Sequence, residues 1–438
     1  MNGIAKLGRV MVWGLVVGAL MVFAGCAEKP REKEDKVIRV VRNLGGREGF
    51  RRHWRAWKSA YERKYPGWTL ELIDLGDTDA AGYYKTRIAT GDLPEIVQTW
   101  LLTPYLADSG YIQPLPDSFY EKFGIPLPEP YKGKRYTSQG GLQIIGIAVN
   151  RKMWADAGVT EPPATWAEFI AGLDRIRKMG KRPLVYGGRQ WSAAMPLTCA
   201  IQSEMYDRDP GAPGPSWSRL MDEEKVRFAS NPTARMILEN MAYLLDNFVE
   251  KGAGSDGYNE EQRDFYGGQG ATWIMGCWIG GEIEPNQVEF EIDYWPIPSM
   301  TGRPPTFLGS PQLQSGWAIS SAVTGERLEK AIAAFEAFYE PEVHEIYLNA
   351  EGQFKLAEKV PIKGLQSDWP ATQKFFDNMT ARLEQYGYVS GWQRALDDKS
   401  PDGAAFERIM QDILAGNRDV DALLKMLDEE WDSARKGR

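Results

Sequence analysis

Few residues in this sequence could carry acid–base or nucleophilic chemistry. Its two histidines are His53 and His344, and we expect both to lie on ordinary helix surfaces. The G-x-S-x-G and H-E-x-x-H signatures of common hydrolases are absent. Adjacent acidic residues such as Asp397 and Asp398 point in different directions on a helix, so they cannot flank one glycosidic bond. The sequence therefore favours binding over catalysis, and we expect the protein not to be an enzyme.

Metal and nucleotide cofactors also lack their usual ligand patterns. Two histidines cannot build a His-rich metal centre, so we expect no metal. The glycines of residues 45–49 do not have the G-x-G-x-x-G spacing, and no P-loop pattern occurs. We therefore expect no cofactor.

Aromatic rings stand out by their number. Tryptophan, at 16 residues, equals phenylalanine, also at 16, which indicates stacking surfaces as well as core packing. The 438 residues are 43% hydrophobic, which is enough for two domains with cores of their own. A formal charge of -8 provides no basic footprint, so nucleic acid is not an expected partner.

Residues 1–25 have the pattern of a signal peptide, with a basic start followed by an apolar run. That run is shorter than the roughly 20 residues that a helix needs to cross a bilayer. The letters FAGC, which end at Cys26, resemble a bacterial lipoprotein box. This resemblance implies lipidation of Cys26 and makes residues 26–35 a tether. The implied location is the outer face of a bacterial membrane, at the cell surface or in the periplasm.

Two further cysteines leave two interpretations open. An exported compartment allows Cys199 and Cys277 to form a disulfide. Cys277 lies within the apolar run 273–279, which favours a buried, reduced thiol instead.

Strands alternate with helices near the start of the mature chain. We expect strands over residues 36–42, 68–73 and 95–100, with helices over residues 50–65 and 80–90. This alternation predicts an α/β fold with a largely parallel sheet, in which ligands usually bind beyond the carboxyl ends of the strands.

Helix-start signals mark later parts of the chain. Thr165 and Glu168 form a capping box before an apolar stripe. Asn231 and Pro232 place proline at the first position of another long helix. We expect the C-terminal third to be mostly helical.

Four segments, taken in order along the chain, match the motifs of one known family. They are GDLPEIVQTW, YKGKRYTSQGGLQIIGIAVNRKMWADAGVTEPPATWAEF, FYGGQGATWIMGCW and GWAISSAVTGERLEKAIAAFEAF. In this order they resemble the extracellular solute-binding proteins of ABC importers, in the sugar-binding family 1 that is typified by maltose-binding protein.

The resemblance implies a periplasmic-binding-protein fold of type II, with two hinge-linked lobes. Lobe 1 would take residues 36–140 and lobe 2 residues 141–295. Residues 296–322 would return to lobe 1, and residues 323–438 would form C-terminal helices mainly of lobe 2. Such a protein acts as a monomer that closes around its ligand, and the permease recognises the closed form.

The resemblance also implies the ligand contacts. A sugar ring has apolar faces and a rim of hydroxyls, so its site pairs aromatic platforms with planar polar side chains. Tryptophans at the family's stacking positions are Trp100, Trp278 and Trp392. The other candidates lie at strand ends or follow the glycine pair 187–188, and they are Asn43, Gln143, Arg189, Gln190, Trp191 and Gln314.

The implied function is capture of a sugar or oligosaccharide and its delivery to the permease of an ABC transporter. One alternative keeps the fold but changes the solute to a polyamine, a peptide or another polyol, or the reader to a sensor kinase. Another is a secreted carbohydrate-active enzyme, because acidic pairs occur in the sequence.

Overall fold

The computed structural model describes two β-sheets, each with a hydrophobic core. The described residues are 36–44, 47–76, 80–99, 102–128, 130–205, 220–221, 223–310, 316–389 and 403–436. Each sheet has five strands and is covered by helices. The predicted α/β class is therefore confirmed.

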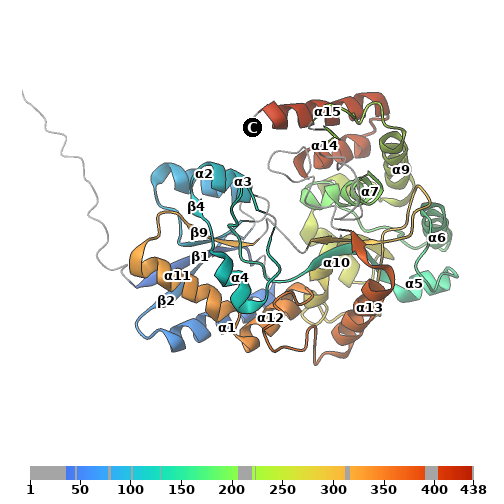
Figure 1. Cartoon of the computed structure of the whole chain (residues 1–438). Coiled ribbons are helices and arrows are strands. Elements are labelled where there is room, and N and C mark those ends of the chain that lie inside the picture. Colours follow the sequence, from blue (N-terminus) through green and yellow to red (C-terminus); the bar gives the residue numbers. More distant parts are fainter. Residues whose placement is uncertain are drawn as a thin grey trace, which may run out of the picture. The chain divides into compact units, whose positions relative to one another are not determined.

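The first sheet has the strand order β2-β1-β3-β9-β4 (Figure 1). Its strands are β1 (Val37–Arg42), β2 (Thr69–Asp74), β3 (Ile96–Gln98), β4 (Ile112–Gln113) and β9 (Trp317–Ser320). β1 runs parallel to β2 and β3, whereas β9 is antiparallel to β3 and β4. The three strands predicted first along the chain and their parallel order are confirmed.

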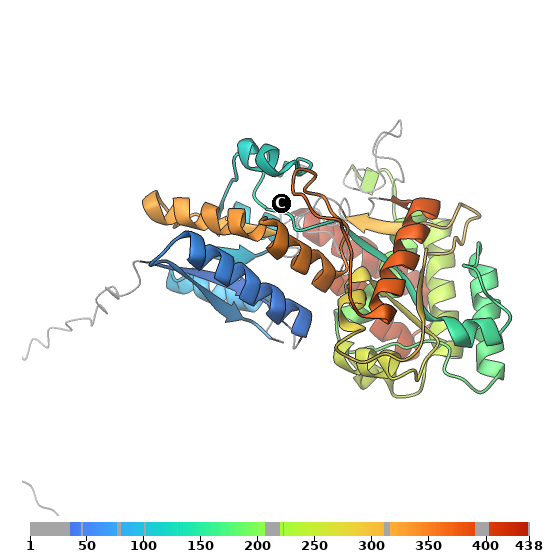
Figure 2. The same ribbon diagram turned by 90° about the horizontal axis from the view of Figure 1, so that it is seen from below.

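Helices cover both faces of this sheet because side chains alternate along its strands. Val40 points into a core with α1 (Glu48–Lys64), α4 (Asp117–Phe123), α11 (Gly325–Phe338) and α12 (Pro341–Glu351). Val41 points the other way, into a core with α2 (Ala80–Thr90) and α3 (Thr103–Asp108). Figure 2 shows α1 and α11 side by side over the first of these faces.

The second sheet is built around β5, which has antiparallel partners along both edges. Its strands are β5 (Gln143–Asn150), β6 (Thr272–Gly276), β7 (Ile292–Trp295), β8 (Phe307–Ser310) and β10 (Tyr388–Val389). β6, β7 and β8 each pair with β5 in antiparallel register, and β10 is parallel to β8.

Helices from several parts of the chain share the core of the second sheet. They are α5 (Arg151–Asp156), α6 (Trp166–Lys178), α7 (Met195–Met205), α9 (Pro232–Phe248), α10 (Tyr258–Tyr266), α13 (Pro370–Tyr386), α14 (Gly403–Leu414) and α15 (Val420–Lys436). Three short 3-10 helices accompany them: η1 (Trp191–Ala194), η2 (Ala253–Ser255) and η3 (Cys277–Glu282). No helix of the described residues has both the length and the apolar character that a membrane span requires.

The segments after β7 divide between the two sheets. Residues 296–322 contain β8, which pairs with β5, and β9, which pairs with β3. α11 and α12 pack into the core of the first sheet, whereas α13, α14 and α15 belong to the core of the second.

The predicted helix starts are confirmed at atomic detail. The Thr165 hydroxyl accepts from the backbone N–H of Glu168, whose carboxylate accepts from the Thr165 N–H in return. Asn231 caps α9, and Pro232 is its first residue. Both signals act within one turn of helix, which is why local sequence was sufficient to find them.

Both histidines are fully buried, so their predicted placement on helix surfaces was wrong. His53 lies three residues after Phe50 and four before Trp57, on the buried face of α1, with Nδ1 2.5 Å from Nη1 of the buried Arg42. His344 lies among the aromatic rings at the start of α12. Burial lowers the pKa of His344 to about 3 and that of His53 well below its ordinary value. Their helical spacing from buried aromatic residues was the signal for this outcome.

The two later cysteines are free and buried. Cys277 begins η3 and is fully enclosed, as the apolar run predicted. Burial raises the pKa of Cys277 to about 12. The disulfide interpretation is thereby excluded for this structure.

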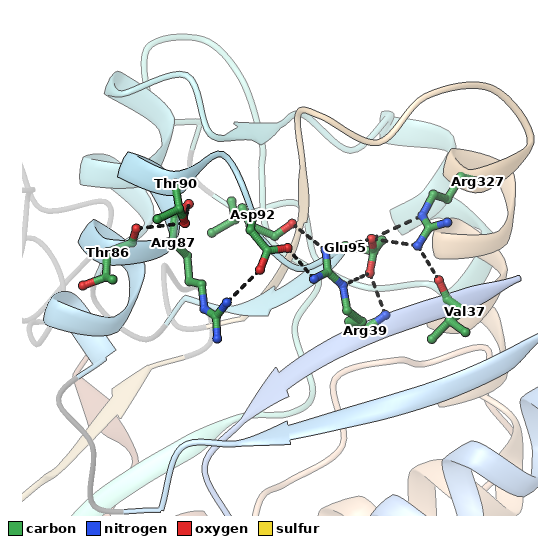
Figure 3. A network of polar contacts seen from close by, with 9 residues as sticks. Val37, Arg39, Thr86, Arg87, Thr90, Asp92, Glu95 and Arg327 are labelled. Atoms are coloured by element: carbon green, nitrogen blue, oxygen red, sulfur yellow. Dashed lines mark hydrogen bonds and ion pairs between the residues drawn. The ribbon is translucent and has the colours of Figure 1, made fainter. Parts of the chain in front are cut away.

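A network of ion pairs joins the amino-terminal ends of β1 and β3 to α11 (Figure 3). Glu95 accepts from the Arg39 backbone N–H at 2.7 Å and from its Nε at 3.1 Å. Arg327 donates to Glu95 at 3.0 Å and to the carbonyl of Val37 at 2.7 Å. Asp92 accepts from Arg39 at 2.6 Å and from Arg87 at 2.7 Å. We call these five charged side chains the Glu95 network.

Candidate functional site

A tight loop at residues 187–191 carries three of the predicted ligand contacts. It leads from the buried residues 183–186 to η1, and its two glycines are also buried. A side chain at Gly187 would place its Cβ 2.7 Å from the carbonyl oxygen of Asp256, and one at Gly188 would meet Leu414 at 2.6 Å. The glycine pair therefore lets the loop backbone lie directly against its neighbours.

Four aromatic residues pack together where this loop ends. This aromatic cluster is Trp191, Tyr258, Trp273 and Trp278. The ring centroid of Trp191 lies 5.1 Å from that of Tyr258 and 6.1 Å from that of Trp278. Tyr258 lies 5.7 Å from Trp273. Trp191 is 46% exposed, so one side of its indole faces solvent, while Tyr258 and Trp278 pack against it.

Trp278 reaches the cluster because a glycine precedes it by two positions. A Cβ at Gly276 would lie 1.8 Å from the Trp278 ring, so the indole folds back over bare backbone. Its Nε1 donates to the Tyr258 hydroxyl at 3.0 Å. Trp278 is 7% exposed, so it is a buried member of the aromatic cluster, and Trp191 is the exposed ring.

Polar groups stand beside the exposed indole. The Arg189 guanidinium is about half exposed and lies 3.0 Å from the Glu260 carboxylate. The side-chain oxygen of Gln190 accepts from the backbone N–H of Tyr258 at 3.1 Å. Both contacts attach the loop to the first turn of α10 and fix the directions of its polar side chains.

Burial raises the pKa of several ionisable side chains in this part of the protein. Burial raises the pKa of Glu261 to about 8, although the N–H of Gly187 opposes this shift. Burial raises the pKa of Glu282, at the end of η3, to about 7, and the charge of Arg47 opposes that shift. Burial also raises the pKa of the Tyr258 hydroxyl, so this group is protonated at neutral pH.

A hollow of about 720 Å³ is lined in part by Gly188 and Arg189 of the loop. Its apolar lining residues include Leu245, Val249 and Leu414. Its polar lining residues include Asp246, Glu250, Lys251 and Gln411. Its volume is in the range of small-molecule sites.

The structure brings together four of the predicted contacts and separates two others. Trp191 and Trp278 belong to the aromatic cluster, and Arg189 and Gln190 precede Trp191 on the same loop. Asn43 follows β1 at the carboxyl end of the first sheet, where its buried Oδ1 has no partner among the described residues. Gln143 begins β5, in register with Ser310 of β8. Four predicted residues lie outside the described residues, namely Cys26, Trp100, Gln314 and Trp392.

Sequence reasoning missed Tyr258 and Glu261. Tyr258 is distant from Trp191 along the chain, and nothing local indicates their contact. Glu261 did have a signal, because it lies three residues after Tyr258 and four before Phe265 on the inward face of α10. An acidic residue in such a stripe is unusual, because burying a carboxyl group is costly, and it marks a candidate site residue.

The arrangement is suited to holding a solute with a flat apolar face and a polar edge. An indole provides the face, and a guanidinium and an amide stand at its edge. Among the residues that the structure describes, no group of three or more histidine, cysteine or acidic side chains could hold a metal ion.

Comparison with known proteins places these features in a family. The sequence model described as "Bacterial extracellular solute-binding protein" matches residues 50–345, more than half of the chain. A protein of Rhizobium meliloti (strain 1021) named "Probable sugar-binding periplasmic protein" is 25% identical over 251 residues. That alignment covers 52% of this chain and 55% of the relative, so the chain spans about half the length of this relative.

Solved structures of low sequence identity share the fold. A "Chitin oligosaccharide binding protein" has a TM-score of 0.76 at 19% identity, covering 92% of this chain and all of that one. "SBP RafE in complex with raffinose" has a TM-score of 0.68 at 19% identity, covering 91% of this chain and 99% of that one. With the sheets, the site and the family match in agreement, the chain belongs to the bacterial extracellular solute-binding proteins.

Proposed function

We propose that this protein captures a sugar or oligosaccharide and delivers it to an ABC transporter. The observation that carries the proposal is Trp191, an indole that is 46% exposed yet held from behind by Tyr258 and Trp278. Exposing a large apolar ring to water costs free energy unless the ring has a partner, and the C–H face of a pyranose is such a partner.

The polar groups beside Trp191 support a polyhydroxylated solute. Arg189 and Gln190 provide donors and an amide at the edge of the ring, where the hydroxyl rim of a stacked sugar would lie. The hollow that Arg189 helps to line offers room for further units of an oligosaccharide. The sugar-binding names of the relatives agree with this assignment.

The finer parts of the proposal follow from the same family. Closure of two lobes around the ligand would produce the form that the permease recognises, with Asn43 contributing from the first sheet. Lipidation of Cys26 would keep the protein at the outer face of the membrane. A Cys26→Ser variant would then be released in soluble form, whereas continued membrane attachment would contradict the anchor.

The experiment is a ligand screen by thermal unfolding and calorimetry. The purified chain is mixed with a panel of monosaccharides and oligosaccharides, with polyamines, peptides and amino acids as control solutes. A ligand at a hundredfold excess over Kd stabilises the native state by about 2.7 kcal/mol, which gives a clear rise in Tm. Stabilisation by a control solute alone would keep the fold and overturn the sugar assignment.

A matched pair of variants locates the site. Trp191→Ala should raise the Kd of the bound glycan about tenfold to a hundredfold, as loss of a central aromatic contact does. Trp369, at the start of α13, is 38% exposed and serves as the control. An equal loss of affinity in Trp369→Ala, or none in Trp191→Ala, would contradict the placement.

A further inference from the structure

Glu261 is a buried carboxylate that joins the loop at residues 187–191 to the aromatic cluster. It is 2% exposed and lies in the first turn of α10. One oxygen accepts from the backbone N–H of Gly187 at 2.6 Å, and the other accepts from Nε1 of Trp273 at 3.3 Å. A single side chain therefore fixes both the start of the loop and the indole behind Tyr258.

Three consecutive backbone N–H groups of the loop bond to the segment around α10. Gly188 donates to the carbonyl of Ala253 at 2.8 Å, and Arg189 donates to that of Asp256 at 3.0 Å. Gly187 donates to Glu261, which is the one side-chain acceptor of the three. A substitution at Glu261 can therefore remove one of these contacts while leaving the other two backbone pairs in place.

Neutral donors, rather than cations, surround this carboxylate. The guanidinium of Arg182 lies near enough to influence it, but it is bonded to Asp264 at 2.7 Å. Arg189 is bonded to Glu260 instead. Among the described residues Glu261 forms no ion pair, so its contribution is directional hydrogen bonding.

We propose that Glu261 is a positioning residue for the solute site, which holds the loop against the aromatic cluster so that Trp191 is presented in one orientation. This inference rests on the proposed function for its binding readout. Its structural content is independent of the solute, because it concerns where Trp191 lies in the unliganded protein.

The test compares two buried glutamates. Glu261→Gln keeps one acceptor oxygen but turns the other position into a donor, which then faces an N–H group. Glu204→Gln is the matched control, because Glu204 is 3% exposed and accepts from the backbone N–H of Met300 and the hydroxyl of Thr301. Both variants replace a buried carboxyl group by an amide of nearly the same size, but the contacts of Glu204 do not include the loop.

Two measurements follow for each variant. Calorimetry gives the Kd for the solute that stabilises the wild-type chain. Fluorine NMR of the protein labelled with 5-fluorotryptophan reports the surroundings of Trp191, whose signal is identified by its loss in Trp191→Phe. We expect Glu261→Gln to raise Kd at least tenfold and to shift the Trp191 signal, and Glu204→Gln to do neither.

Several outcomes would overturn the proposal. These are an unmoved Trp191 signal, a Kd within twofold of wild type, or equal effects in Glu204→Gln. A lower Tm with unchanged Kd would show that Glu261 is merely structural. If Glu261→Gln does not fold, Glu261→Asp replaces it. The shorter side chain withdraws the carboxyl oxygens by one methylene, and the same changes in Kd and in the Trp191 signal are expected. If no solute binds the wild type, the sugar assignment fails, and the Trp191 signal alone decides the positioning role.

Discussion

Two glutamates, Glu95 and Glu261, each accept a backbone N–H from a distant segment, but their surroundings differ. Glu95 is 4% exposed and bonds to the guanidinium groups of Arg39 and Arg327 (Figure 3). Glu261 is 2% exposed and bonds to two neutral N–H groups. Two guanidinium groups balance the charge of Glu95, whereas Glu261 has only neutral hydrogen-bond donors among its direct contacts.

We expect Glu95 to stabilise the fold of the first sheet and Glu261 to position the exposed Trp191. The Glu95 network ties β1 to the turn before β3 and to α11, at the amino-terminal edge of the first sheet. Ligands of such sheets usually bind at the carboxyl ends of the strands, so we expect this network to have no direct role in binding. Glu261 lies one turn of helix from Tyr258 and behind an exposed indole. The variants below test this contrast.

The largest effect is expected from Glu95→Ala. The substitution leaves the partly buried guanidinium groups of Arg39 and Arg327 without their shared counter-charge. Breaking such a buried pair should lower the free energy of unfolding by about 3–5 kcal/mol. Urea unfolding followed by circular dichroism measures this loss.

The folded fraction of Glu95→Ala should bind the solute with wild-type Kd. A change in Kd comparable to that of Trp191→Ala would show that the Glu95 network does take part in the site, and the contrast would fail.

Opposite pH dependence is expected for the two regions. The folded-state pKa of Glu261 is about 8, above its unfolded value, so its burial reduces the free energy of unfolding progressively as pH rises from about 5 to 8. Arg39 lowers the pKa of Asp92, so that pair contributes stability above the ordinary pKa of aspartate, and the contribution is lost as pH falls.

Urea unfolding at several pH values between 3 and 9 would show both slopes. Glu261→Gln should reduce the decline toward pH 8 without abolishing it, because burial also raises the pKa of Glu282, Glu351 and Glu407. Asp92→Asn should flatten the acid side alone. An unchanged alkaline slope in Glu261→Gln would mean that Glu261 is already ionised in the folded protein at low pH.

A smaller effect is expected from Tyr258→Phe. Its hydroxyl accepts from Nε1 of Trp278, and removal leaves that buried donor unpaired, at a cost of about 1–2 kcal/mol. Because Trp278 and Tyr258 both support Trp191, Kd should also rise several-fold.

Tyr61→Phe is the control for this prediction. The Tyr61 hydroxyl is buried in the core of the first sheet and has no hydrogen-bond partner among the described residues. Its removal should leave stability and Kd nearly unchanged. Equal destabilisation by both variants would show that the hydroxyl of Tyr258 has no special role in the cluster.

The smallest effect is expected from Arg87→Ala. Arg87 and Asp92 form an ion pair at the rim of the Glu95 network, with side chains 41% and 45% exposed. Solvent screens such pairs, so the free energy of unfolding should fall by less than about 1 kcal/mol. A loss as large as that of Glu95→Ala would show that the network acts as one unit rather than through its buried centre.

Local sequence was sufficient for much of the fold. The strands β1, β2 and β3, the capping box at Thr165 and the start of α9 at Pro232 follow from side-chain alternation and helix-end chemistry within a few residues. The ordered motifs also identified the family, whose sequence model matches residues 50–345.

The functional surface was predicted in part. Loop residues Arg189, Gln190 and Trp191 and the glycine-preceded Trp278 were selected from sequence, and the structure places them around one cluster. Their role as ligand contacts stays a prediction. Trp278 was selected as a stacking face, whereas its low exposure makes Trp191 the open ring of the pair.

The sequence alone determined the first three strands and the starts of α6 and α9, because those preferences act over a few residues. Tertiary structure alone decided that Tyr258 supports Trp191 and that Arg42 is the partner of the buried His53. It also decided that Glu261 holds the backbone at Gly187. These contacts join segments that are far apart along the chain or lie on different elements, and burial of a polar group depends on every element packed around it.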